Sequence, residues 1–424
     1  MKNSILLFIL LLSSGLLFSQ IVNIPDPVFK SRLIEEGVDT NNDGEIQESE
    51  ALAVTDLDVL AYASEPKIGS LEGIQYFTNL VSLDFSRNLI TSFDASIYPN
   101  LDYLRAYGNN LNSINLNGLD DLTFLHLNNN NLTNVNLNSL VNLDILFLGN
   151  NNLLDVDLSS LINLTVFECR NCGLTSVDFQ QNSILDEISI KDNSISALNF
   201  SDLPLLRILF MDNNLFTELD LTNANSILWV ECSENAIETV NVNGLSNLAS
   251  LNISNNNLNE IDCSNSPVTF LNCSNNPNLS YINVQNGFSQ NPDPDLLYFP
   301  LYFYDLPNLE SICMDPEDWD SLIYSGYNPD NVTVFTGPDC TLSINEFSLS
   351  KTYIYPNPVS NSFTIQSNTE ITSYSLHDIT GKLIINTNKE DQLKSNISFL
   401  NSGIYFLTLE SASGNQKIIR LLKK

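Results

Sequence analysis

Histidine is nearly absent from this sequence, and so are the short motifs on which much enzyme chemistry depends. The 424 residues include two histidines, His126 and His377, and contain no G-x-S-x-G, no H-E-x-x-H and no glycine-rich loop that cradles phosphate. Acidic pairs such as Asp186 and Glu187 fall on an expected strand with no sign of a pocket. The sequence therefore predicts a protein that is not an enzyme.

Positive charge is also scarce. The chain has 17 Lys and Arg against 50 Asp and Glu, and no Lys or Arg lies between Arg207 and Lys351. Residues 1–345 hold 44 acidic and 9 basic residues, a net charge of −35, whereas residues 346–424 hold 6 and 8, a net charge of +2. An acidic body repels nucleic acid and anionic membranes, so we expect neither as a partner. Solubility in salty surroundings also accounts for such acidity, and the change in charge predicts a domain boundary near residue 345.

Long apolar runs are missing beyond the N-terminus. The run from Ile5 to Phe18 is too short for a membrane span, which takes about 20 residues, and Ser19 and Gln20 follow it. This pattern predicts a secretory signal peptide over residues 1–20. No cysteine lies near the expected cleavage site, which argues against a lipid anchor. We expect an exported protein without a membrane span.

Leucine and asparagine, in contrast, are abundant and recur with a period of 21 residues. Copies of the pattern LxxLxLxxNxLxxIxLxxLxN begin at 80, 101, 122, 143, 164, 185, 206, 227 and 248, and a further copy begins at 268. The alternation at positions 4 and 6 predicts a short strand with two inward side chains. Position 9 is asparagine at Asn88, Asn109, Asn130, Asn151, Asn193, Asn214, Asn235, Asn256 and Asn276. We expect these amides to bond the backbone of turns that have no sheet partner.

This spacing resembles the leucine-rich repeat family over residues 57–312. The resemblance implies a curved solenoid with a parallel β-sheet on its concave side. Ten or eleven strands would make a surface about 50 Å long. Since one repeat cannot bury its own core, the array depends on contacts between neighbours and on caps at its ends. We assign residues 313–345 to the C-terminal cap and a linker.

The segment DTNNDGEIQESE, residues 39–50, fits the loop pattern of a calcium-binding EF-hand. The predicted oxygen ligands are Asp39, Asn41, Asp43, Glu45, Gln47 and Glu50. Gly44 permits the sharp turn, and short helices are expected on both sides of the loop. Only one such loop is present, whereas sensors work in pairs. We therefore interpret residues 21–56 as a helical, EF-hand-like N-terminal cap that Ca2+ stabilises. The alternative is a loop that keeps the shape without the ion.

The seven cysteines divide into those inside and those outside the repeats. The cysteines expected at inward repeat positions are Cys169, Cys232, Cys263 and Cys273. Cys172 replaces the asparagine of position 9, so repeat register explains the C-x-x-C pair that it forms with Cys169, although this spacing also occurs in redox and metal motifs. Cys313 and Cys340 lie outside the repeats, and we predict that a disulfide between them closes the C-terminal cap, which export permits.

Residues 346–424 show short alternating strands separated by turn residues, which predicts a small all-β sandwich. The segments YPNP at 355–358, GKL at 381–383 and GIY at 403–405, together with the final Lys-Lys pair, resemble the type A C-terminal sorting domain of the type IX secretion system. The resemblance implies a Gram-negative bacterium and passage through the periplasm. It also implies recognition by the type IX machinery and a final location at the outer-membrane surface or outside the cell. An ordinary β-sandwich binding module is the alternative.

Outward positions 3 and 5 of the expected strands carry many aromatic side chains, which is typical of a recognition surface. The predicted ligand-binding residues are Tyr103, Arg105, Phe124, His126, Ile145, Phe147, Phe210, Trp229 and Phe270. All five basic residues between 80 and 276 also fall at positions 2 to 8, where local ion pairing is the competing explanation. We expect the concave face to bind a protein or a glycan. The alternative is a non-catalytic structural protein of the surface or matrix with no specific ligand.

Overall fold

The computed structural model describes residues 20–288, 301–318 and 332–336, and most of the segment from 353 to 424 except 356–357, 360–362, 368–369, 379–381, 398 and 412–415. The chain divides into two compact units, Met1–Thr336 and Gly337–Lys424. The predicted signal peptide, apart from Gln20, and the predicted boundary near residue 345 lie outside the described residues. In the described part of the chain, no helix has the length and apolar character needed to cross a membrane.

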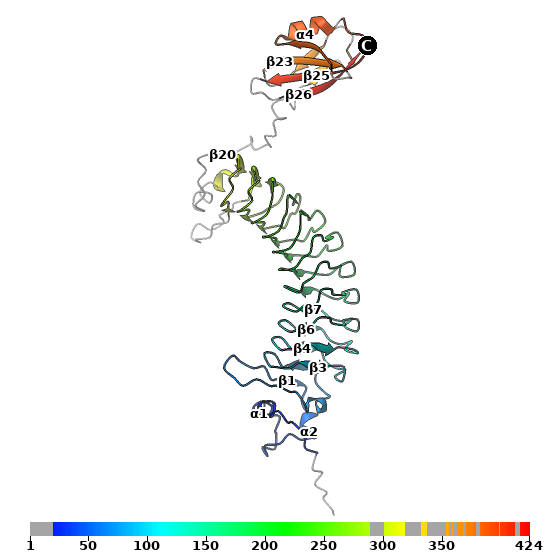
Figure 1. Cartoon of the computed structure of the whole chain (residues 1–424), viewed down its shortest axis with the longest axis vertical. Helices are drawn as coiled ribbons and strands as arrows, with labels where there is room; N and C mark the ends of the chain where they lie inside the picture. Colours follow the sequence, from blue (N-terminus) through cyan, green and yellow to red (C-terminus); the bar gives the residue numbers. More distant parts are fainter. Residues whose placement is uncertain are drawn as a thin grey trace, which may run out of the picture. The chain divides into compact units, whose positions relative to one another are not determined.

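The first unit is a stack of similar turns whose short strands pair into one parallel sheet of 12 strands (Figure 1). Its strands, in sheet order, are β1 (Asp56–Asp58), β2 (Ser82–Asp84), β4 (Tyr103–Arg105), β6 (Phe124–His126), β7 (Ile145–Phe147), β8 (Val166–Glu168), β9 (Glu187–Ser189), β10 (Ile208–Phe210), β12 (Trp229–Glu231), β14 (Ser250–Asn252), β16 (Phe270–Asn272) and β18 (Leu301–Tyr302). The sheet lies on the concave side of the stack, and it has one strand more than the ten or eleven expected because β18 extends it at its C-terminal end.

The opposite wall of the stack carries smaller parallel sheets. They are formed by β3 (Ser92–Asp94) with β5 (Ser113–Asn115), by β11 (Glu218–Asp220) with β13 (Thr239–Asn241), and by β15 (Glu260–Asp262), β17 (Tyr281–Asn283), β19 (Ser311–Met314) and β20 (Thr333–Thr336). Between the two walls, leucines such as Leu104 and Leu125 are fully buried. One hydrophobic core runs from Val22 to Met314, so the N-terminal segment and the repeats share it.

The asparagines of position 9 form a buried ladder along the turn that follows each strand of the large sheet. The amide of Asn130 donates to the carbonyl oxygens of Ala106 and Leu127, both at 2.9 Å, and its oxygen accepts from Leu111 N at 3.0 Å. Each rung thus links two successive repeats through backbone groups that no sheet would satisfy. The residue before each rung adopts a left-handed conformation, as at Asn129 with φ 57°, which asparagine tolerates well. The predicted role of these amides is confirmed.

The ladder is interrupted where Cys172 replaces asparagine. Cys172 is bonded to Cys169 in a disulfide, with a Cα–Cα distance of 5.7 Å. Both residues occupy the buried positions expected from repeat register, but the sequence analysis did not predict the bond between them. The backbone N–H groups of Leu153 and Leu154 both donate to Cys172 O, at 3.0 and 3.3 Å, where the amide oxygen of a normal rung would accept. Leu154 takes φ 64°, a costly conformation for a leucine.

The N-terminal cap has the predicted order of helix, loop and helix. Helix α1 (Pro27–Glu35) begins at Asp26, whose side chain accepts from the backbone N–H groups of Val28 and Phe29, and α2 (Glu48–Ala51) follows the loop. The short 3-10 helix η1 (Ile74–Tyr76) leads into the first full repeats. Since the cap contributes buried side chains such as Phe29 and Ile46 to the common core, it covers the first turn of the solenoid.

The second unit contains a four-stranded antiparallel sheet in the order β24-β23-β25-β26 and a two-stranded sheet, β21-β22. The strands are β21 (Tyr353–Tyr355), β22 (Thr364–Gln366), β23 (Ile371–Asp378), β24 (Leu383–Thr387), β25 (Gly403–Ser411) and β26 (Gln416–Lys423). The antiparallel strands agree with the expected β-domain, which gains an unpredicted helix, α4 (Glu390–Ile397). At the end of the first unit, η2 (Pro316–Asp318) follows β19.

Candidate functional site on the concave face

An aromatic and cationic patch covers the N-terminal half of the concave sheet. We call it the N-terminal patch, and it consists of Arg87, Tyr103, Arg105, Tyr107, Phe124, His126 and Phe147. The strand register places Tyr103 beside Phe124 and Arg105 beside His126. The five patch residues on the strands are therefore a direct consequence of repeating the same two outward positions on adjacent strands, whereas Arg87 and Tyr107 come from the turns that follow.

The rings of this patch stack against one another. The centroids of Tyr103 and Phe124 lie 4.3 Å apart with planes 13° from parallel, and those of Tyr107 and His126 lie 4.8 Å apart at 16°. Phe147 contacts His126 with centroids 5.1 Å apart. These side chains are all partly buried, and each stacked pair shields one face of both of its rings.

Two arginines lie over these rings. The Arg87 guanidinium carbon is 5.4 Å from the Tyr107 ring centroid, and that of Arg105 is 5.7 Å from the centroids of both Tyr103 and Phe124. Cation–π contacts of this kind contribute about 0.5–1 kcal/mol at exposed sites. The sequence analysis included Arg105 in the site but omitted Arg87 and Tyr107. Arg87 and Tyr107 lie at repeat positions 8 and 7, directly after the strand, and this closeness to the outward strand positions is the sequence feature that could have identified them.

His126 is electrically neutral at physiological pH. Burial, together with the nearby positive charge of Arg105, lowers its pKa to about 4. Its Nδ1 atom is buried and has no hydrogen-bond partner among the described residues, and the same holds for Nε of Arg105. At the adjoining strand, burial raises the pKa of Asp84, whose carboxylate is 3.9 Å from the Arg105 side chain.

A second cluster occupies the concave face beyond Glu187. Phe210 and Trp229 meet edge to face with centroids 5.6 Å apart, and Lys191 Nζ lies 4.6 Å from the Phe210 centroid. Trp229 is 42% exposed, and its indole Nε1 donates to Glu231 Oε1 at 2.7 Å. Phe210 and Trp229 were predicted from the sequence as ligand-binding residues. Lys191 was expected in this region only as one of the five clustered basic residues, and Glu231 was not predicted.

Aliphatic and acidic residues separate the two clusters. Along the sheet, Ile145 pairs with Phe124 on one side and with Val166 on the other, and Glu187 comes next, before Ile208. Burial raises the pKa of Glu187, and Asp186 adds to the effect. Phe270 belongs to neither cluster and instead contacts Tyr302, with centroids 5.7 Å apart. The predicted site residues thus form two groups, joined by Ile145, and one outlying residue, Phe270.

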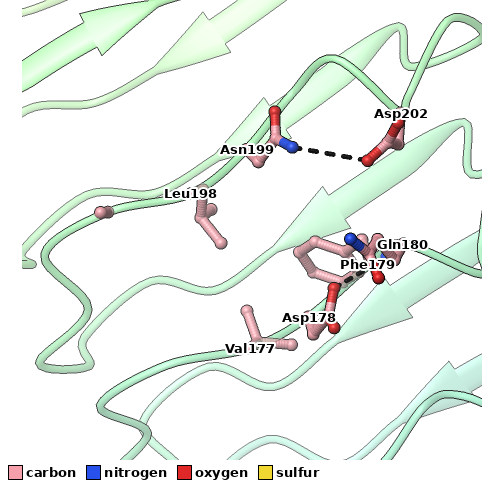
Figure 2. Close-up of a pocket in the computed structure, with 8 residues that line it drawn as sticks. Val177, Asp178, Phe179, Gln180, Leu198, Asn199 and Asp202 are labelled. Carbon is pink, nitrogen blue, oxygen red and sulfur yellow. Dashed lines mark hydrogen bonds between the residues drawn. The ribbon is translucent and has the colours of Figure 1, made fainter.

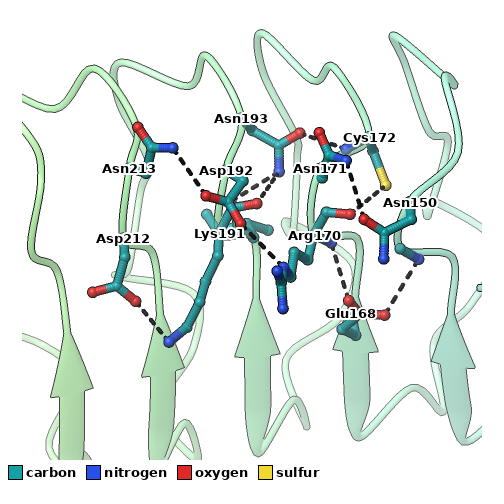
Figure 3. A network of polar contacts seen from close by, with 12 residues as sticks. Asn150, Glu168, Arg170, Asn171, Cys172, Lys191, Asp192, Asn193, Asp212 and Asn213 are labelled. Atoms are coloured by element: carbon teal, nitrogen blue, oxygen red, sulfur yellow. Dashed lines mark hydrogen bonds and ion pairs between the residues drawn. The ribbon is translucent and has the colours of Figure 1, made fainter.

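The remaining basic side chains near this face are neutralised locally, as Figure 3 shows for two of them. Arg170 Nε lies 3.0 Å from Asp192, Lys191 Nζ lies 2.8 Å from Asp212, and Arg207 is paired with Asp186. Ion pairing, the competing explanation for the clustered charges, therefore holds closely for three of the five basic residues between 80 and 276, and Arg105 reaches Asp84 at 3.9 Å, near the limit of an ion pair.

The loop at residues 39–50 is closed by its own side chains. Asp39 accepts from the N–H of Gly44 at 2.9 Å, and Glu50 accepts from the N–H groups of Thr40 and Gln47 at 2.8 and 2.9 Å. Burial acts to raise the pKa of Glu50, but hydrogen bonds outweigh it and lower the pKa. Glu50 therefore stays ionised, as a cation ligand must.

The other predicted loop ligands are held in the same way. Asn41 donates to Asp43 at 3.1 Å and to Gln47 at 2.8 Å, and Glu45 pairs with Lys30 at 2.7 Å. Over the described residues, no group of three or more His, Cys, Asp or Glu side chains is arranged to hold a metal ion. Calcium coordination would therefore require these side chains to exchange some of their hydrogen bonds for the ion.

Outside the concave face, the predicted disulfide of the C-terminal cap stays a prediction. Cys313 is buried on β19 and has no disulfide partner among the described residues, and Cys340 lies outside them. Cys232, Cys263 and Cys273 are buried, and burial raises their pKa values, so these thiols are unreactive.

A shallow hollow of about 370 Å3 lies between two repeats away from the concave face (Figure 2). Its lining residues are Val177, Asp178, Phe179, Gln180, Ala197, Leu198, Asn199 and Asp202. Asp178 accepts from Gln180 N at 2.9 Å, and Asp202 accepts from the Asn199 amide at 3.4 Å. Since these carboxylates serve local turns and the lining has no nucleophile or histidine, the hollow gives no support to catalysis.

Comparison with known proteins identifies both parts of the chain. Residues 353–424 match the family described as the secretion system C-terminal sorting domain. The functional domain of InlJ from Listeria monocytogenes, which includes a cysteine ladder, is similar with a TM-score of 0.55 at 21% identity, covering 96% of this chain and 98% of that one. The internalin InlF from Listeria monocytogenes has a TM-score of 0.55 at 20% identity, covering 74% of this chain and 90% of that one. No curated protein matches the chain. The chain thus has a leucine-rich repeat solenoid as its body and a secretion-system sorting domain at its C-terminus.

Proposed function

We propose that this protein is an exported, non-catalytic binding protein that recognises a protein ligand through its concave face. The observation that carries the proposal is the N-terminal patch, where stacked rings and two arginines form one continuous surface. Tyr, Phe, Trp and Arg are the residues enriched at the centres of protein interfaces. The repeating fold supplies a rigid frame on which these side chains are already ordered.

The arrangement of the rings favours a protein over a glycan. A sugar bound by stacking needs an open aromatic face, but Tyr103 and Phe124 cover each other, as do Tyr107 and His126. Arg87 lies over the ring of Tyr107, and the guanidinium carbon of Arg105, 5.7 Å from the centroids of both Tyr103 and Phe124, lies beside that stacked pair. The exposed ring edges and the neighbouring Ile145 and Val166 suit apolar side chains of a partner protein.

Affinity capture from the native environment with the full mature chain tests this function. We expect a protein to be retained by the wild type and lost from Phe124→Ala, with affinity reduced by about 2 kcal/mol. Phe288→Ala is the matched control, because Phe288 is 51% exposed but lies outside the concave strands. A glycan array run in parallel covers the other ligand class. Retention that is the same for both variants, or glycan binding that depends on Phe124, would contradict the proposal.

The sorting domain supports export to the cell surface or beyond. We propose the route expected from the sequence, with passage through the periplasm of a Gram-negative bacterium and recognition of residues 346–424 by the type IX machinery. A variant that ends near Leu342 should keep its ligand but remain in the periplasm. Recovery of that shortened protein outside the native cell would show that the assignment is wrong.

We further propose that Ca2+ stabilises the N-terminal cap. Carboxylate and amide oxygens at loop positions 1, 3, 5, 9 and 12 support this, as does the ionised state of Glu50. Because the cap shares the hydrophobic core of the repeats, ordering the loop would stabilise the first turns of the solenoid as well.

A further inference from the structure

The basic residues of the concave region differ in how they are neutralised. Arg170, Lys191 and Arg207 each have an aspartate close by, on a neighbouring turn. Among the described residues no carboxylate lies within ion-pair distance of Arg87, and Arg105 reaches Asp84 only at 3.9 Å. In a chain with 50 acidic and 17 basic residues, two arginines left without close acidic partners on one patch are an exception that local pairing does not explain.

These two arginines belong to one connected structure. Arg87 lies over Tyr107, which stacks on His126, and His126 contacts Phe124, over which Arg105 lies. The buried Nε of Arg105 and Nδ1 of His126 have no hydrogen-bond partner in the part of the chain that the structure describes. A buried polar group without a partner costs about 1–3 kcal/mol, so the patch contains hydrogen-bonding capacity that the folded chain itself does not use.

We infer that Arg87 and Arg105 form a subsite for a carboxylate of the protein partner, an Asp or Glu side chain set among apolar residues. The guanidinium fork matches the geometry of a carboxylate, and resting on an aromatic ring holds it in place before binding. Ile145 and Val166, on the next two strands beyond Phe124, receive the apolar neighbours of that acid. This inference rests on the proposed function of the concave face.

The net negative charge of the whole molecule limits the classes of ligand that can approach the patch. A net charge of −33 repels a polyanion at long range, so a uronic acid polymer or another acidic polysaccharide is a poor ligand. A single carboxylate inside an apolar epitope meets little of that repulsion and is recognised at short range. The same reasoning makes an acidic protein surface a poor partner and a nearly neutral one a good partner.

A displayed library of random peptides, selected on the full mature chain, tests the subsite. We expect selected peptides to contain an Asp or Glu next to apolar residues. Synthetic copies should lose at least about tenfold in affinity with Arg87→Gln or with Arg105→Gln. Replacing the peptide acid by its amide should cause a similar loss, and the two changes together should cost little more than either alone. Thermal unfolding of each variant checks that the fold is kept.

Arg170→Gln and Arg207→Gln are matched controls, because they remove arginines that already have aspartate partners. Their affinities should stay within about twofold of the wild type. Selected peptides without acids, or acidic peptides indifferent to Arg87 and Arg105, overturn the subsite. Polygalacturonate binding that needs both arginines overturns the choice of a protein partner. Peptide binding that Phe124→Ala leaves unchanged shows instead that the proposed function of the concave face is wrong.

Discussion

The asparagine ladder and the concave face lie on the same turns of the solenoid but follow opposite rules. Along the ladder, Asn109, Asn130 and Asn151 make the same three kinds of bond, to backbone atoms of their own repeat and the previous one. On the concave face, the same outward position holds Tyr103 in one repeat and Phe124 in the next, and the two residues pair across adjacent strands. The ladder must repeat because the backbone that it satisfies repeats, whereas an outward side chain is free to vary. Stability therefore depends on position 9 of the repeat, and recognition depends on the outward positions 3 and 5.

The largest effect is expected from breaking a rung. Asn130→Ala leaves the buried N–H of Leu111 without a partner and removes one of the two amide donors to the carbonyl oxygens of Ala106 and Leu127. The free energy of unfolding should fall by about 3 kcal/mol. Urea unfolding measures this loss. Asn131→Ala is the control, because Asn131 is exposed and should change stability by less than about 0.5 kcal/mol. Equal losses in the two variants would mean that the ladder does not stabilise the stack.

Removing an aromatic side chain from the concave face should weaken ligand binding more than it lowers the free energy of unfolding. Phe124→Ala removes the ring that contacts Tyr103, His126 and Phe147, and we expect about 2 kcal/mol less binding energy. Because Phe124 is only partly buried, unfolding should change by less than in the Asn130 variant. Titration of the captured partner and urea unfolding, run on the same samples, separate the two quantities. A stability loss as large as that of Asn130→Ala, with unchanged affinity, would place recognition elsewhere.

At Cys172 a disulfide replaces an asparagine of the ladder, so the contribution of a rung can be compared with that of a disulfide at the same position. The disulfide to Cys169 stabilises the wild type by about 2 kcal/mol through the constraint that it places on the unfolded chain. Cys172→Asn should restore a normal rung that does not depend on redox conditions. We expect a reductant to lower the unfolding free energy of the wild type by about 2 kcal/mol more than that of the variant. Equal losses would show that the disulfide adds no stability.

Calcium should act on one end of the array. With 5 mM Ca2+ and an affinity typical of extracellular sites, about 10⁻⁴–10⁻³ M, the ion should stabilise the cap by about 1–2 kcal/mol. Thermal unfolding with Ca2+ and with chelator measures this for the wild type and for Glu50→Gln, which should not respond. An unchanged wild-type midpoint would exclude the proposed role of the ion, and an equal shift in both proteins would place the ion elsewhere.

The smallest effect concerns His126. Its pKa of about 4 in the fold lies below the value near 6.5 of an unfolded chain, so folding favours the neutral ring. The stabilisation is complete above pH 6.5 and is lost as the pH falls toward 4. After allowance for partial exposure, about 1 kcal/mol should disappear over that range. His126→Gln should lose correspondingly less than the wild type between pH 7 and 4.5, and parallel curves for the two proteins would contradict the assignment.

Much of this architecture was predictable because the repeats follow one another with a regular period of 21 residues. Leucine at positions 1, 4 and 11 and asparagine at position 9 fix the repeat length, the inward set and the register, so Tyr103, Phe124 and Ile145 had to be neighbours. The helices on either side of Gly44 were also predictable, since local capping and turn chemistry determine them. The disulfide between Cys169 and Cys172 was not predicted, because register alone says which residues are buried and not whether two of them are bonded.

By itself the sequence determined the leucine-rich repeat fold, the sorting domain and the residues of the concave column, because periodicity translates directly into neighbours on a parallel sheet. Only the tertiary structure decided which partner each charged side chain contacts, an aspartate or an aromatic ring. Arg170 and Arg207 turn toward aspartates, whereas Arg87 and Arg105 lie over aromatic rings. Side-chain direction depends on the rotamers and partners available on adjacent turns, and a linear pattern does not contain that information.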